Sequence, residues 1–288
     1  HNISFGRSYD DSNLRLSLGY LDQEGAIETS STRRINGSVK YNQQFFDDQL
    51  SVTANLKGTQ TRNSFEPGVV GNAISFAPTQ PVRDVRSPYG GFFEWSSTIA
   101  EKNPVGQYIL SENNGEEFRS LGNVETEYQV PYVDGLSARL NLGYDVTTGE
   151  RELFQPTNLK QQADADDPGL VQRYTFSRVT SLVDAYLSYD RRFEEISSQI
   201  EFTGGYSYQE TNEEYPEFDI TGLTTNIFEQ NNAAAGTTQT ANITEIPSRL
   251  ISGFGRLNYT FMDRYLLTLT VRRDGSSKFG PANRWGTF

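Results

Sequence analysis

Clustered acidic side chains are the groups in this sequence that come closest to catalytic or metal-binding chemistry. They gather at 163–169 (ADADDPG) and 210–217 (ETNEEYPE). Paired carboxylates act in catalysis beside a nucleophile or an imidazole, and they bind divalent cations at regular ligand spacings. The chain has no Cys and one His, His1, and neither segment has an EF-hand spacing. We predict no catalytic residue and no metal site. Both segments are expected to be solvated loops, with cation binding as the alternative.

A glycine-containing stretch at 253–258 (GFGRLN) is the one segment that resembles a nucleotide-binding motif. It lacks the third glycine of such motifs and lies within an alternating, strand-like pattern. Close packing of the backbone, or space left in the barrel interior, explains these glycines better. We therefore predict no cofactor site.

Aromatic residues gather in the long segment 63–116, which also holds five of the prolines. Phe92, Phe93 and Trp95 lie close together there, and aromatic rings stack on sugar rings and pack against each other. Two interpretations stay open: contact with a substrate, or a hydrophobic cluster that folds the loop. Long loops are often functional, so these three residues are candidate site residues.

Charge and composition exclude several classes of protein. The formal net charge is -12, and no basic cluster is visible, so nucleic-acid binding is not expected. Aromatics make up 12% of the chain, and 25 residues are Gly, which favours strands and turns. No apolar run reaches the roughly 18 residues that a transmembrane helix needs. An all-β protein is the first expectation.

Alternation of apolar and polar residues predicts the strands. The clearest example is 136–146 (LSARLNLGYDV), where leucines and Tyr144 alternate with Ser, Arg, Asn, Gly and Asp. A soluble sandwich would show the same alternation. The expected strands lie near 1–8, 13–23, 33–46, 49–62, 117–130, 136–147, 177–193, 199–209, 249–261 and 265–273.

The links between these strands alternate between short and long. The long ones are 24–32, 63–116, 148–176, 210–248 and the corner after Arg273. Bacterial outer-membrane barrels have short periplasmic turns and long extracellular loops, whereas a Greek-key sandwich has no reason to alternate in this way. The sequence therefore predicts an antiparallel transmembrane β-barrel, and this chain supplies about ten of its strands.

The polar side of each expected strand would face the barrel interior, where charge is tolerated. Arg139, Arg256 and Arg272 are on that side. An Arg on the lipid side at mid-depth would cost roughly 2–4 kcal/mol. These three residues are further candidates for contact with a substrate or with an interior domain, although structural ion pairs explain such residues as well.

The last part of the chain carries a recognisable signature. The segment 258–288 (NYTFMDRYLLTLTVRRDGSSKFGPANRWGTF) resembles a barrel segment of the SusC/RagA-type TonB-dependent outer-membrane transporters. Three more stretches resemble stretches of that family and come in the same order along the chain: 17–25 (SLGYLDQEG), 103–105 (NPV) and 119–130 (RSLGNVETEYQV). The resemblance covers nearly the whole chain.

The resemblance implies a barrel of about 22 strands in the outer membrane, in contact with lipid. Such transporters import oligosaccharides or peptides, pair with a SusD-type surface lipoprotein and draw energy from the TonB complex. Residues 1–288 would be part of the barrel domain, and the plug domain and the remaining strands would lie outside this sequence. No enzyme activity is implied. The alternatives are a passive outer-membrane porin and a surface β-rich glycan-binding or adhesin module.

Overall fold

The chain forms one antiparallel sheet of eleven strands that pair in chain order. The computed structural model describes the backbone of residues 1–288 and their side chains except that of Ala233. The strands are β1 (Asn2–Ser8), β2 (Ser12–Glu24), β3 (Ser31–Phe45), β4 (Leu50–Ser64), β5 (Glu112–Gln129), β6 (Leu136–Gln155), β7 (Leu170–Phe193), β8 (Ser198–Leu223), β9 (Gly236–Phe261), β10 (Tyr265–Ser276) and β11 (Trp285–Thr287).

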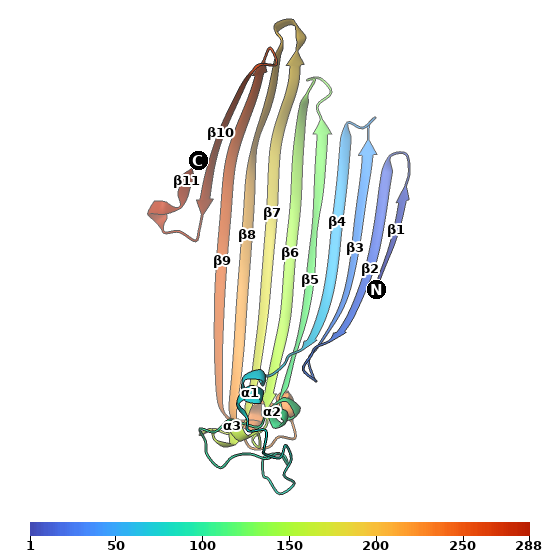
Figure 1. Ribbon diagram of the computed structural model, residues 1–288. Helices are drawn as coiled ribbons and strands as arrows, with labels where there is room; N and C mark the ends of the chain where they lie inside the picture. The colour runs from blue at the N-terminus through green and yellow to red at the C-terminus, as the bar shows by residue number, and fades with distance from the viewer.

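The two ends of the sheet differ in their connections. At the upper end in Figure 1 the strands are joined by the short turns 9–11, 46–49, 130–135, 194–197 and 262–264. The long segments 65–111, 156–169 and 224–235 lie at the other end, with the helices α1 (Val70–Ser75), α2 (Pro104–Leu110) and α3 (Lys160–Ala163) (Figure 1). Within the described part of the chain, no helix is both long and apolar enough to cross a bilayer. We call these ends the turn end and the loop end.

Gly135 shows how a turn-end residue fixes the strand register. Its φ is +84°, a conformation that L side chains rarely adopt. A Cβ added there would lie 1.9 Å from the carbonyl oxygen of Asp190. The glycine therefore allows the β5–β6 turn to pass close to β7, where the Asp190 N–H donates to the Gly135 carbonyl.

The register divides the side chains into two faces. Asn141 of β6 lies opposite Asp184 of β7, and its neighbour Leu142 lies opposite Val183. We call the side that carries Asn141 the polar face and the side that carries Leu142 the apolar face. Leucines of the apolar face remain uncovered, and Leu269, for example, is 54% exposed. A sandwich would bury this face against a second sheet, whereas a barrel wall turns it to lipid.

The expected architecture is confirmed: the chain is all-β, antiparallel and unclosed, as part of a barrel wall is. Two details of the sequence prediction are wrong. The segment 210–217 lies inside β8 rather than in a loop, and β5 to β9 extend beyond the expected bounds at the loop end. The corner after Arg273 leads into β11, which pairs with β10 through Arg273 and Thr287.

Candidate functional site

A chain of hydrogen-bonded polar side chains crosses the polar face. Asn55 donates to Asn123 (3.1 Å), which donates to Asn141 (2.8 Å), which donates in turn to Asp184 (3.3 Å). Ser207 donates to the other carboxylate oxygen of Asp184 (2.5 Å). These residues come from five successive strands, β4 to β8. We call them the polar belt, and their mutual bonding gives the face a fixed surface at this depth.

The three arginines predicted as site residues all lie on the polar face. Arg139 is two residues from Asn141 on β6, while Arg256 and Arg272 lie on β9 and β10. They are not brought together into one cluster. Each has a polar neighbour: Arg139 donates to Glu127 (2.7 Å), Arg256 to Asn258 (3.4 Å) and Arg272 to Asp274 (2.9 Å).

The aromatic residues of the long loop take different positions. Phe92 is only 1% exposed, and the guanidinium of Arg83 lies 3.9 Å from its ring centre. Its faces are covered, so it forms part of the loop core. Phe93 and Trp95 are half-buried and meet edge to face at 5.3 Å, and Phe76 also meets Phe93 edge to face at 6.4 Å. These two rings keep surface that a ligand can reach.

Asn103 holds the loop core together and is 1% exposed. Its side chain accepts hydrogen bonds from two backbone N–H groups in the first turn of α2 and donates to the carbonyls of Val82 and Phe93. Its own N–H donates to the carboxylate of Glu94 (3.1 Å). Burial raises the pKa of Glu94, although the hydrogen bond from Asn103 opposes this shift. The segment 65–111 is therefore a folded unit.

Ion pairs link this unit to the loop after β6. Asp164 accepts from Lys102 of the long loop (2.9 Å) and from Lys160 of α3 (2.5 Å). Lys160 is 3% exposed, and its ammonium lies 4.8 Å from the ring centre of Tyr89. The hydrogen bond from Lys160, helped by Lys102, holds the pKa of Asp164 below its ordinary value despite burial. We call these four residues the loop latch.

A tyrosine pair that the sequence did not reveal lies on the polar face at the loop end. Tyr174 and Tyr215 stack with ring centres 6.3 Å apart and planes tilted by 26°. Beside them is a hollow of about 290 Å³. Its lining residues are Arg151, Leu153, Gln172, Tyr174 and Glu217.

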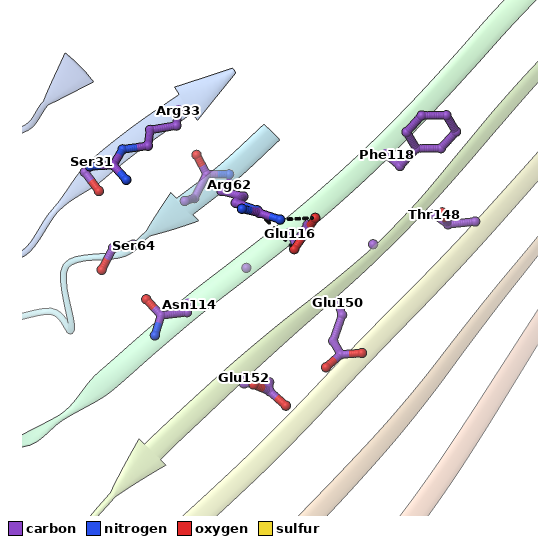
Figure 2. Close-up of a pocket in the computed structure, with 13 residues that line it drawn as sticks. Ser31, Arg33, Arg62, Ser64, Asn114, Glu116, Phe118, Thr148, Glu150 and Glu152 are labelled. Atoms are coloured by element: carbon purple, nitrogen blue, oxygen red, sulfur yellow. Dashed lines mark hydrogen bonds and ion pairs between the residues drawn. The ribbon is translucent and has the colours of Figure 1, made fainter. Parts of the chain in front are cut away.

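A larger groove, of about 690 Å³, lies at the loop end of β3 to β6. Figure 2 shows arginines from β3 and β4 on one side and glutamates from β5 and β6 on the other. The register places these charged side chains on the apolar face, beyond the point where the leucines end. The charged lining residues are Arg33, Arg62, Glu116, Glu150 and Glu152.

The acidic segments gain no metal-site geometry. Within the described residues, no group of three or more His, Cys, Asp or Glu side chains is arranged to hold a metal ion. Asp164 of the segment 163–169 is held by the loop latch. Glu210 and Glu213 of β8 pair with Arg249 and Arg178. These carboxylates serve as partners of arginine and lysine.

Comparison with known proteins agrees with this geometry. The chain is 28% identical over 313 residues to the TonB-dependent receptor SusC of Bacteroides thetaiotaomicron. The alignment covers 100% of this chain and 30% of SusC. It is 25% identical over 305 residues to the TonB-dependent receptor P3 of Formosa agariphila, across 99% of this chain and 29% of P3. The chain is related to TonB-dependent receptors of the SusC type. It spans about three tenths of the length of these curated relatives. No protein-family model matches it.

Solved structures show the same fold for this SusC-related chain. It aligns with the RagAB peptide importer in its open-open state with a TM-score of 0.79 and 19% identity, over 100% of this chain and 32% of that one. The ferripyoverdine receptor of the outer membrane of Pseudomonas aeruginosa aligns with a TM-score of 0.59 and 11% identity, over 96% of this chain and 35% of that one. The strands thus have the fold of an outer-membrane β-barrel wall. In such barrels the apolar face is the one that meets lipid and the polar face the one that meets the interior.

Proposed function

We propose that residues 1–288 form part of the barrel domain of an active transporter that imports large nutrients across the outer membrane. The rest of the barrel, a plug domain and the segment that contacts TonB would belong to other parts of the protein. The observation that carries the proposal is similarity to a part of SusC along the whole of this chain, together with a polar face suited to an aqueous interior. The relatives are named as receptors and importers rather than enzymes.

The cargo under this proposal is an oligosaccharide or a peptide, and a SusD-type surface lipoprotein delivers it. Two kinds of group are suited to such a cargo. The polar belt can form hydrogen bonds with it, and the tyrosine pair and the partly exposed rings of Phe93 and Trp95 can stack on flat groups such as sugar rings. Arg139, Arg256 and Arg272 would line the path or contact the plug. Phe92 would support the loop from within rather than contact the cargo, because its ring is covered.

Uptake by cells tests this function. The full-length parent protein would be expressed in a strain that lacks its own copy, and growth on single oligosaccharides and peptides would be measured with and without tonB. Active transport predicts growth on one such nutrient that disappears when tonB is deleted. Growth that persists without tonB would instead support a passive porin. Co-purification of a surface lipoprotein under mild extraction would support the SusD-type partner.

A further inference from the structure

The groove of about 690 Å³ lies on the lipid side of the barrel wall, so it is outside the transport path. On β6, the apolar face carries Leu140, Leu142, Tyr144 and Val146 and continues without a break to Thr148, Glu150 and Glu152. On β5 the same change occurs at Phe118, beyond which Glu116 and Asn114 follow toward the loop end. The groove therefore begins where the apolar surface ends.

Two arginines and three glutamates line the groove, and the glutamates are paired with arginines of the wall. Arg62 pairs with Glu116 (3.3 Å), and Arg173 of β7 pairs with both Glu150 (3.5 Å) and Glu152. Each carboxylate can accept hydroxyl hydrogens with its remaining lone pairs. The three arginines offset the three glutamates, and Asp22, the partner of Arg33, adds one negative charge at the rim. A polyhydroxylated group that places a phosphate beside the arginines and its hydroxyls beside the glutamates is compatible with such a surface.

Arg33 supplies the strongest donor at the rim. Its side chain is 67% exposed, and its Nε donates to Asp22 over a long 3.4 Å. A guanidinium has five N–H donors, and paired donors match the oxygens of a phosphate. Figure 2 shows Arg33 on β3 and Arg62 on the neighbouring β4 at the same side of the groove. Two guanidinium groups on adjacent strands can hold one phosphate between them.

Hydroxyl and amide groups complete the lining beside one aromatic ring. Ser31, Ser64, Asn114 and Thr148 offer donors and acceptors suited to sugar hydroxyls, and Phe118 is 50% exposed at the apolar border. Such a mixture of neutral polar groups and an aromatic ring is typical of carbohydrate sites.

We propose that this groove binds the phosphorylated sugar headgroup of a glycolipid in the outer leaflet. The acyl chains would lie on the leucine-rich surface on the turn-end side of Phe118, and the headgroup would lie in the groove on its loop-end side. The continuity of the apolar strip with a polar groove selects a lipid over a soluble sugar. The pair of arginines, Arg33 and Arg62, together with the hydroxyl groups selects a phosphosugar over a simple phospholipid headgroup.

Bound lipid on the full-length parent protein tests this site. The protein would be extracted in mild detergent, and retained glycolipid and phospholipid would be quantified by native mass spectrometry and by sugar and phosphate analysis. The double variant R33Q/R62Q should retain at least about tenfold less glycolipid, because charge-assisted contacts to the phosphate are lost. Arg249 provides the matched control. It too pairs with a glutamate, Glu210 (2.8 Å), on the same face but outside the groove, so R249Q should retain glycolipid as the unmodified protein does.

Correct folding of each variant would be checked by heat-modifiable gel mobility. A second variant, Ser64→Trp, fills the groove without removing a charge and should also lower retention. The proposal is overturned if the unmodified protein holds no glycolipid above the detergent background, if R249Q loses as much as R33Q/R62Q, or if phospholipid alone is retained. Equal binding of the deacylated headgroup and the intact glycolipid would also contradict it, because the acyl chains would then contribute nothing.

Discussion

The two faces of the sheet are built from the same strands, yet they treat their side chains in opposite ways. On the polar face, Asn123, Asn141 and Asp184 bond one another across neighbouring strands. On the apolar face, Leu142 and Leu269 are left without a covering layer. The difference is what a wall between two surroundings requires: a side that meets water or supplies its own hydrogen bonds, and a side without polar groups that is suited to hydrocarbon.

The strongest way to break this comparison is to place a charge on the apolar face. Leu142→Arg in the full-length barrel should lower its free energy of unfolding by about 2–4 kcal/mol, because the guanidinium would lie in hydrocarbon. Gly143→Arg, one residue along β6, is the control on the polar face, where an added Cβ meets neighbours no closer than 3.5 Å. Denaturant titration in liposomes measures both. Equal losses would contradict the assignment of the faces.

A second change tests the turn between β5 and β6, which lies against β7 and helps to fix the register of the strands. Gly135→Ala should destabilise the barrel by about 1–3 kcal/mol, because it forces a side chain into a positive-φ conformation. The added Cβ would also contact the Asp190 carbonyl at 1.9 Å. Gly58→Ala is the control, since a Cβ there meets no atom within 4 Å. A similar midpoint of unfolding for both variants would show that the turn does not constrain the register.

The polar belt offers a smaller effect. Asp184→Leu removes the acceptor of Asn141 and Ser207 and should cost about 1–2 kcal/mol, because two donors lose their partner. Asp184→Asn keeps one carbonyl oxygen and should recover part of this loss. The same denaturant titration compares them. If leucine is tolerated as well as asparagine, water replaces the belt and the polar face is not held by it.

The smallest effect concerns the loop latch and depends on pH. The pKa of Asp164 is lowered in the folded protein, so the latch contributes its stability above the ordinary carboxyl pKa of about 3.9 and loses it as pH falls through the lower folded value. The hydrogen-exchange protection factors of residues 65–111, which correct for the intrinsic pH dependence of amide exchange, should therefore fall on acidification below about pH 4. Asp164→Asn should lower these protection factors already at neutral pH, and they should then depend less on pH. A variant with unchanged exchange would mean that the latch does not hold the loop.

The sequence predicted the wall well and its loop end poorly, for one physical reason. Within the bilayer only one face is wet, so apolar and polar residues alternate, as at 136–146. Beyond the bilayer both faces are wet, and the alternation vanishes although the hydrogen-bonded ladder continues. The segment 210–217 was therefore expected in a loop, but it continues β8 in register with β9.

The site residues show the same limit. Alternation alone predicted which side of the sheet carries Arg139, Arg256 and Arg272. Their partners did not, because these depend on register between strands. Tyr174 and Tyr215 are far apart in the sequence, and only the pairing of β7 with β8 makes them neighbours.

Accessibility along β6 tests the assignment of the two faces most directly. Because the chain has no Cys, single cysteines can be placed at successive positions from 137 to 152 in the full-length protein, with any other native Cys replaced. Labelling in outer membranes would use a charged, water-soluble maleimide. We predict strong labelling at the odd positions 137–145, none at the even positions 138–146, and a return of labelling at 150 and 152, where the groove begins. Uniform labelling, or labelling of the even positions alone, would contradict a barrel wall with lipid on its leucine side.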